Sequence, residues 1–123
     1  MNGNSFLIDT NIILYLLGGN QTVFDILYEH DLYVSFISQL ELLSYRNINN
    51  AEEIRIKRFI SDCSLIDINE SIKQNVITIR KQVSLKLPDC IIAATAMHLG
   101  IPLLTADKNF KQLPEISVVI YNE

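Results

Sequence analysis

The sequence has 123 residues, 49% of them apolar and 20% charged, which indicates one folded domain over residues 1–123 and excludes two ordinary domains or a mainly disordered chain. The net charge of −4 argues against a protein that binds nucleic acid through a broad basic face. The longest apolar runs are too short for a membrane span, and the N-terminus lacks the basic start of a secretion signal, so we expect a cytoplasmic protein without membrane association.

Apolar segments and helical patterns alternate along the first half of the chain. The apolar segment 5–8 predicts a strand that stops at Asp9, and the run 12–17 before two glycines predicts a helix. Apolar spacing predicts a helix over 21–29, and β-branched and aromatic residues predict a strand over 32–37. Helices are expected from Ser38 and over 51–60, the first of them with a Ser38-x-x-Glu41 capping box.

The second half continues this alternation. Residues 65–68 predict a strand, and apolar residues every three or four positions predict an amphipathic helix over 69–85. Pro88 suits the start of a buried helix that Gly100 ends, and segments 102–105 and 117–121 predict two more strands. Because each parallel strand needs a crossover helix, we predict a three-layer α/β/α fold with a central parallel sheet of about five strands.

Four acidic residues are predicted to meet at one rim of this sheet, although their local sequence context is ordinary. Asp9 closes the first predicted strand and Asp107 the fourth. Glu41 falls in the first turn of the helix after the second strand, and Asp89 begins the helix that leads into the fourth. In parallel α/β sheets the ligand site lies outside the carboxyl ends of the strands. The four carboxylates therefore lie where a ligand would bind.

Each of these acids also has a structural explanation that needs no ligand. Asp9 and Asp89 suit helix N-termini, Glu41 completes the capping box, and Asp107 suits a turn. These roles do not explain why four carboxylates share one edge, since like charges repel. A bound cation removes this cost, and oxygen ligands without Cys or His pairs favour Mg²⁺ or Mn²⁺ over zinc.

Four segments carry a family resemblance: Phe6-Leu-Ile-Asp9-Thr-Asn11, Ser38-Gln-Leu-Glu41-Leu, Leu87-Pro-Asp89-Cys-Ile-Ile-Ala-Ala94 and Leu104-Thr-Ala-Asp107-Lys-Asn-Phe110. In this order they resemble the motifs of PIN-domain ribonucleases, in particular the VapC-type toxins of toxin–antitoxin pairs. The resemblance covers the whole chain. It implies that the catalytic and metal-binding acids are Asp9, Glu41, Asp89 and Asp107, with Thr10, Asn11, Thr105 and Asn109 in supporting positions.

The resemblance implies a metal-dependent endoribonuclease that hydrolyses RNA phosphodiester bonds with Mg²⁺ or Mn²⁺ as cofactor. A recessed acidic site favours single-stranded or looped RNA, and the candidate RNA-binding residues at its rim are Arg46, Lys108 and Lys111. The implied protein partners are a cognate antitoxin and a second copy of the chain in a homodimer. Many relatives have Asp at the position of Asn109, so we expect a second metal ion there to bind more weakly.

Two alternatives remain at this point. A PIN fold that has lost catalysis and serves as a binding module is kept open by Asn109. A phosphorelay receiver domain has a similar length, a parallel α/β fold and a need for Mg²⁺, but it requires an acid pair after the first strand and a Lys after the fifth. Asp9 stands alone, the chain ends Tyr121-Asn-Glu123, and Asp67 is predicted within the third strand. The complete set of four acids favours the nuclease.

Overall fold

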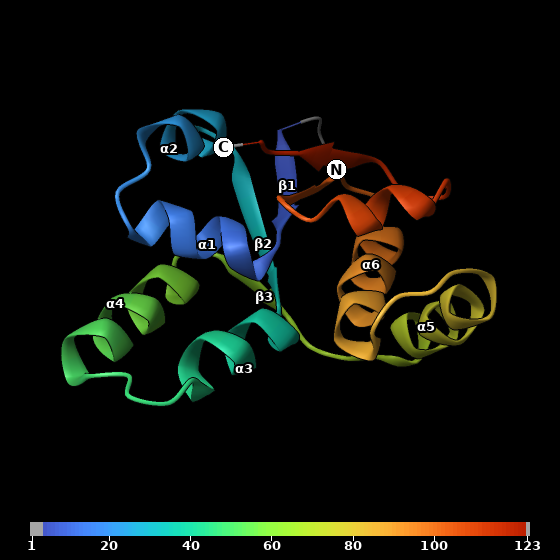
Figure 1. The fold of residues 1–123 in the computed structure, drawn as a ribbon, viewed down its shortest axis with the longest axis horizontal. Coiled ribbons are helices and arrows are strands. Elements are labelled where there is room, and N and C mark those ends of the chain that lie inside the picture. The colour runs from blue at the N-terminus through green and yellow to red at the C-terminus, as the bar shows by residue number, and fades with distance from the viewer. Residues whose placement is uncertain (1–3, 123) are drawn as a thin grey trace.

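The computed structural model describes residues 4–122 and contains one five-stranded sheet in the order β3-β2-β1-β4-β5 (Figure 1). Every neighbouring pair of strands is parallel. The strands are β1 (Ser5–Ile8), β2 (Asp31–Ser35), β3 (Ser64–Ile66), β4 (Leu103–Thr105) and β5 (Val118–Ile120). The prediction of an α/β fold around a parallel sheet is therefore confirmed.

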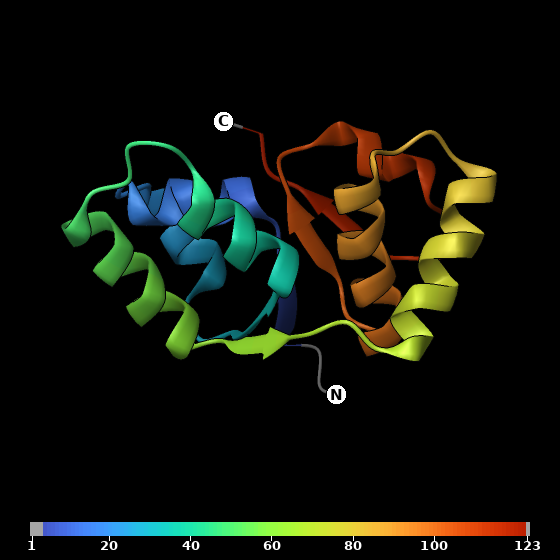
Figure 2. The same ribbon diagram turned by 90° about the horizontal axis from the view of Figure 1, so that it is seen from below.

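Helices cover both faces of the sheet. Figures 1 and 2 show α1 to α4 on one side, and α5, α6 and the short 3₁₀ helix η1 on the other. Their bounds are α1 (Thr10–Leu17), α2 (Gln21–Leu27), α3 (Phe36–Ser44), α4 (Asn50–Ser61), α5 (Glu70–Gln82), α6 (Leu87–Leu99) and η1 (Lys108–Gln112). Within residues 4–122, no helix has the length and apolar character that crossing a bilayer requires.

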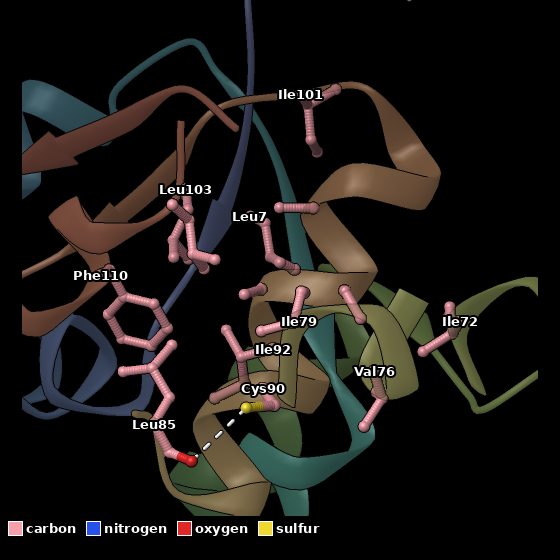
Figure 3. Packing of buried hydrophobic residues seen from close by; sticks show 14 residues of the cluster. Leu7, Ile72, Val76, Ile79, Leu85, Cys90, Ile92, Ile101, Leu103 and Phe110 are labelled. Carbon is pink, nitrogen blue, oxygen red and sulfur yellow. Dashed lines mark hydrogen bonds between the residues drawn. The ribbon is translucent and has the colours of Figure 1, made fainter. Parts of the chain in front are cut away.

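The central strands divide the core into two apolar clusters, because successive side chains of a strand point to opposite faces. Leu7 and Leu103 pack with α5, α6 and η1, whereas Ile8 and Leu104 pack with α1 to α4. Figure 3 shows the first cluster, in which Phe110 of η1 lies near Leu103 and Leu85. Because both faces of the central strands are covered, β1 and β4 contain consecutive apolar residues, 6–8 in β1 and 103–104 in β4.

The strand order reverses between β1 and β4, which places the topological switch point of the sheet at their carboxyl ends. This order also excludes the receiver-domain alternative, because receiver folds place β3 inside the sheet, whereas β3 lies at the edge here. Asp67 follows β3 and does not lie within it, so that part of the sequence prediction is wrong. The two residues that follow β1 and β4 at the switch point are Asp9 and Ala106.

The boundary between β2 and α3 differs from the sequence prediction. The strand ends at Ser35, whose hydroxyl caps the helix by accepting a hydrogen bond from the Ile37 amide. Ser38 is therefore a fully buried residue inside α3, and the predicted capping box with Glu41 does not form. Glu41 lies in the second turn of α3, not in its first. A capping box occurs instead at the start of α4, between Asn49 and Glu52.

Candidate active site

Asp9 is the innermost acidic residue at the switch point. It is only 6% exposed and caps α1 through Oδ1, which accepts a hydrogen bond from the Thr10 amide at 2.8 Å. Its other oxygen, Oδ2, accepts a hydrogen bond from the Thr105 hydroxyl at 2.6 Å. Burial raises the pKa of Asp9 from 3.8 to about 6, the two hydrogen bonds oppose this rise, and the charges of Asp89 and Glu41 add to it.

Thr105 joins the two central strands at the site. It is the last residue of β4 and is fully buried. While its hydroxyl donates to Asp9, its oxygen accepts a hydrogen bond from the Asp107 amide at 3.0 Å. Asp107 in turn caps η1 by accepting from the Asn109 amide at 2.9 Å. The Asn11 side chain accepts a hydrogen bond from the Ala106 amide at 3.4 Å, which ties α1 to the same turn.

Thr10 connects Glu41 to the strand end. Its hydroxyl oxygen lies 2.6 Å from Oε1 of Glu41 and 2.8 Å from the hydroxyl oxygen of Ser38. A hydroxyl carries one proton, so Thr10 donates to the carboxylate and accepts from the buried Ser38. The first turn of α1 and the second turn of α3 are thereby held together, and Glu41 is oriented although its side chain is exposed.

Asp89 enters the site from the N-terminal turn of α6. It is half-buried, and burial raises its pKa, with further increases from the charges of Asp107 and Glu41 and a smaller opposing effect from Lys86. These interactions place Asp89 among the other three acids. The structure thus brings together all four carboxylates that the sequence placed at one rim, and their order of depth runs from buried Asp9 to exposed Glu41.

A cleft of about 590 Å³ opens beside Asp89 and Asp107. Its other lining residues are Arg80, Ser84, Leu85, Lys86, Leu87 and Asn109. The predicted RNA-binding residues do not line it: Lys108 and Lys111 are exposed on η1, and Arg46 is exposed in the segment between α3 and α4.

The sequence did not identify Arg80 and Lys86 as site residues, although Arg80 falls within the amphipathic helix predicted over 69–85. A signal for them exists in the chain order. The short segment 83–86 joins α5 to α6. The end of α5 must therefore lie close to the start of α6, which carries Asp89. Basic residues at the end of the first helix and just before the second therefore lie beside the acids.

The four acids have the chemistry of a hard-cation site without forming a closed cage. Among residues 4–122, no three Asp, Glu, His or Cys side chains are close enough to enclose a metal ion by themselves. Within residues 4–122 the structure shows one ion pair, between Lys57 and Glu53, away from the four acids. No salt bridge therefore neutralises the repulsion among the four acids, although the charge of Lys86 partly offsets it at Asp89. Mg²⁺ binds through a few carboxylates and retains several waters, so this open set of oxygen donors fits it.

A family model for the PIN domain matches residues 6–116. The chain belongs to the PIN domain family. A structure of a toxin–antitoxin complex from Klebsiella pneumoniae contains a similar chain with 30% identity and a TM-score of 0.80, covering 92% of this PIN domain and 94% of that chain. VapBC-1 from nontypeable Haemophilus influenzae is similar at 26% identity and a TM-score of 0.76, covering 94% and 97% of the two chains.

A third similar structure is VapBC2 from Rickettsia felis bound to a DNA fragment from their promoter. It has 20% identity and a TM-score of 0.85 and covers 96% of this PIN domain and 99% of that chain, so it supports the fold alone. The sequence comparison with curated proteins finds no match. The resemblance to PIN domains and VapC-type toxins, stated above from four motifs, is confirmed by the family match and by these structures.

Proposed function

We propose that this PIN domain is a metal-dependent endoribonuclease and the toxin of a toxin–antitoxin pair. The observation that supports it best is the buried Asp9 carboxylate at the switch point, which forms no ion pair within residues 4–122 and whose pKa is raised by burial and further by the charges of Asp89 and Glu41. PIN domains are generally nucleases, and the similar structures from Klebsiella pneumoniae and Haemophilus influenzae are a toxin–antitoxin complex and VapBC-1. The proposal adds RNA as the substrate and Mg²⁺ or Mn²⁺ as the cofactor.

Asp9, Glu41, Asp89 and Asp107 would hold the metal ion. When bound, Mg²⁺ or Mn²⁺ lowers the pKa of a water molecule and neutralises charge on the scissile phosphate. Thr105 and the Thr10 amide fix both oxygens of Asp9 before any ligand arrives, which reduces the cost of ordering this group. The Thr10 hydroxyl orients Glu41 in the same way. Thr10, Asn11 and Thr105 are therefore positioning residues in this proposal.

The substrate would be single-stranded or looped RNA, because Asp9 lies below the rim that the other acids form and a duplex backbone cannot enter such a recess. Lys108 and Lys111, beside Asp107 and Asn109 on η1, are proposed to contact the RNA backbone, as is Arg46 beyond α3.

An antitoxin is the proposed protein partner, and a homodimer is the proposed active unit. Half-exposed apolar side chains such as Leu14 on α1 and Leu40 on α3 support apolar interfaces of this kind. We also keep the expectation that the protein acts in the cytoplasm, where its RNA substrate is found.

Cleavage of single-stranded RNA with Mg²⁺, with Mn²⁺ and with EDTA tests the proposal. We expect cleavage with either metal, none with EDTA, and none from the Asp9→Asn or Asp107→Ala variants. Asp25→Asn is the matched control, because Asp25 is an exposed acid on α2 that does not lie among the four acids.

Expression of the wild-type chain is expected to stop growth, and Asp107→Ala is expected to relieve this effect. Sequencing RNA ends after induction would identify the cleaved bonds. Full cleavage by Asp9→Asn would contradict the assignment of the site. A wild-type chain that binds RNA or an antitoxin but cleaves no RNA with either metal would support the alternative of a non-catalytic binding module.

A further inference from the structure

We propose that the cleft beside Asp89 and Asp107 binds the RNA backbone through Arg80 and Lys86, each of which contacts one phosphate near the one that is cleaved. This inference rests on the proposed nuclease function and names a substrate-binding surface for it. Neither residue belongs to the four family motifs.

The cleft continues away from the acids along a basic path. A second depression, of about 370 Å³, shares Arg80, Ser84 and Leu85 with the first and reaches Lys81 and Gln82 at the end of α5. A chain leaving Asp107 would thus pass Arg80 and arrive at Lys81. Apart from Asp89 and Asp107 at the site itself, no acidic residue lines either depression within the described part of the chain.

The two basic side chains are available to a ligand. Arg80 and Lys86 are exposed, and neither forms an ion pair in the part of the chain that the structure describes. One terminal nitrogen of Arg80, Nη1, donates to the Leu85 carbonyl at 3.3 Å, which leaves other N–H groups of the guanidinium to contact a phosphate. Lys86 precedes the first turn of α6, and no side chain caps that turn.

The segment that carries these groups is anchored in the core. Leu85 is buried, and its carbonyl accepts a hydrogen bond from the Cys90 thiol at 3.6 Å in addition to that from Arg80 (Figure 3). The side chain of Leu85 lies near Phe110 of η1, which belongs to the same cluster. Arg80 and Lys86 are therefore held beside the acids in the free protein, so that binding needs little reordering of this segment.

Electrostatics favour an RNA backbone as the occupant. The four acids repel phosphates, and the whole chain has a net charge of −4, so RNA must gain its attraction from local basic groups next to the site. A polar, basic cleft that ends at the carboxylates meets this need. An acidic protein segment would also be attracted by the bases, but it would gain nothing from ending at Asp89 and Asp107.

The test is the salt dependence of KM for cleavage of a fluorescein-labelled single-stranded oligoribonucleotide in Mg²⁺. Each lost phosphate contact lowers the slope of log(1/KM) against log[salt] by roughly 0.7 in magnitude, which corresponds to about a fivefold rise in KM at about 0.1 M salt. We therefore expect about fivefold for Lys86→Gln, about 25-fold for the Arg80→Gln/Lys86→Gln double variant, and kcat within about twofold of the wild type.

Two controls separate charge from folding. Lys73→Gln removes an exposed charge of α5 that lines neither depression and should leave KM and the slope unchanged. Arg80→Lys keeps the charge and should retain most of the affinity. Lys86 makes no hydrogen bond to another side chain in the described structure, so Lys86→Gln should fold normally and carries the test if Arg80→Gln loses stability.

Wild-type slope and KM in a folded Lys86→Gln or double variant, with the wild type cleaving RNA, would overturn this inference and leave the nuclease proposal intact. Equal changes of KM and slope in Lys73→Gln would also overturn it. So would a double variant that keeps the wild-type slope with RNA but no longer binds polyglutamate, because this result would assign the cleft to an acidic protein segment. A wild type that cleaves no RNA with Mg²⁺ or Mn²⁺ would remove the nuclease proposal and this inference together.

Discussion

Replacing Asp9 by Asn is expected to stabilise the metal-free protein while removing the function of the site. Burial raises the pKa of Asp9 from 3.8 to about 6, so between these pH values the folded chain binds more protons than the unfolded chain. The stability that Asp9 contributes is therefore complete below its unfolded pKa and is lost as the pH rises through about 6. The loss amounts to roughly 3 kcal/mol of unfolding free energy at pH 7.

Asn imitates the protonated acid in both of its contacts. Its Oδ1 keeps the hydrogen bond from the Thr10 amide that caps α1, and its Nδ2 faces the Thr105 hydroxyl where the acid proton would lie. The variant should therefore keep at pH 7 the stability that wild-type Asp9 provides only in its neutral form. We expect Asp9→Asn to be more stable than the wild type by about 3 kcal/mol at pH 7, with no difference below about pH 3.

Urea unfolding in EDTA at several pH values measures this difference. Subtracting the wild-type curve from that of Asp9→Asn removes the groups that both proteins share, and Asp25→Asn controls for the loss of one exposed acidic charge. A difference that does not change with pH, or a variant less stable than the wild type at pH 7, would refute the argument that the folded structure confines an unfavourable charge at Asp9.

Three further outcomes follow from the same site. Mg²⁺ or Mn²⁺ at ten times its dissociation constant should raise the unfolding free energy of the wild type by roughly 1.4 kcal/mol, and equal melting temperatures with metal and with EDTA would count against a metal site. Thr10→Val removes the hydroxyl between Ser38 and Glu41, which should lower the unfolding free energy by about 1–3 kcal/mol and reduce cleavage. An unchanged kcat would show that Glu41 does not need the Thr10 hydroxyl. Asn109→Asp should keep or raise cleavage, most clearly at low Mg²⁺, whereas a large loss at every metal concentration in a folded variant would mean that the Asn109 amide donates a hydrogen bond to the substrate.

The positions that the sequence predicts well depend on local patterns. Asp9 follows a short apolar run, and α6 has Pro88 in its first turn and Gly100 as its C-cap, as expected. Glu41 reaches the predicted rim from the second turn of α3, not from the first turn as the sequence suggested. Two serines three residues apart offer two possible helix starts. Both are fully buried, and the structure uses Ser35 as the cap, while the Ser38 hydroxyl contacts Thr10 of α1, a long-range contact that no local pattern reveals.

The contacts that define the site join residues far apart in the chain. Thr10 meets Ser38 and Glu41 across 28 and 31 positions. Thr105 meets Asp9 across 96 positions. An amphipathic pattern indicates which face of a helix is buried, but the neighbour across the interface follows from tertiary packing. For this reason the sequence identified the acids and missed the bases of the cleft.

The local and the functional explanations of Asp9 describe different oxygens of one side chain. Capping of α1 uses Oδ1, and any polar residue with a short side chain would supply it. Oδ2 is held by Thr105 on the other central strand, and helix formation does not require that contact. Capping a helix does not require a buried charge. The charged form of the buried Asp9 carboxylate destabilises the fold at neutral pH. Asn keeps the cap and removes the charge, so a variant that is stable but inactive would show that the carboxylate serves the site at the expense of stability.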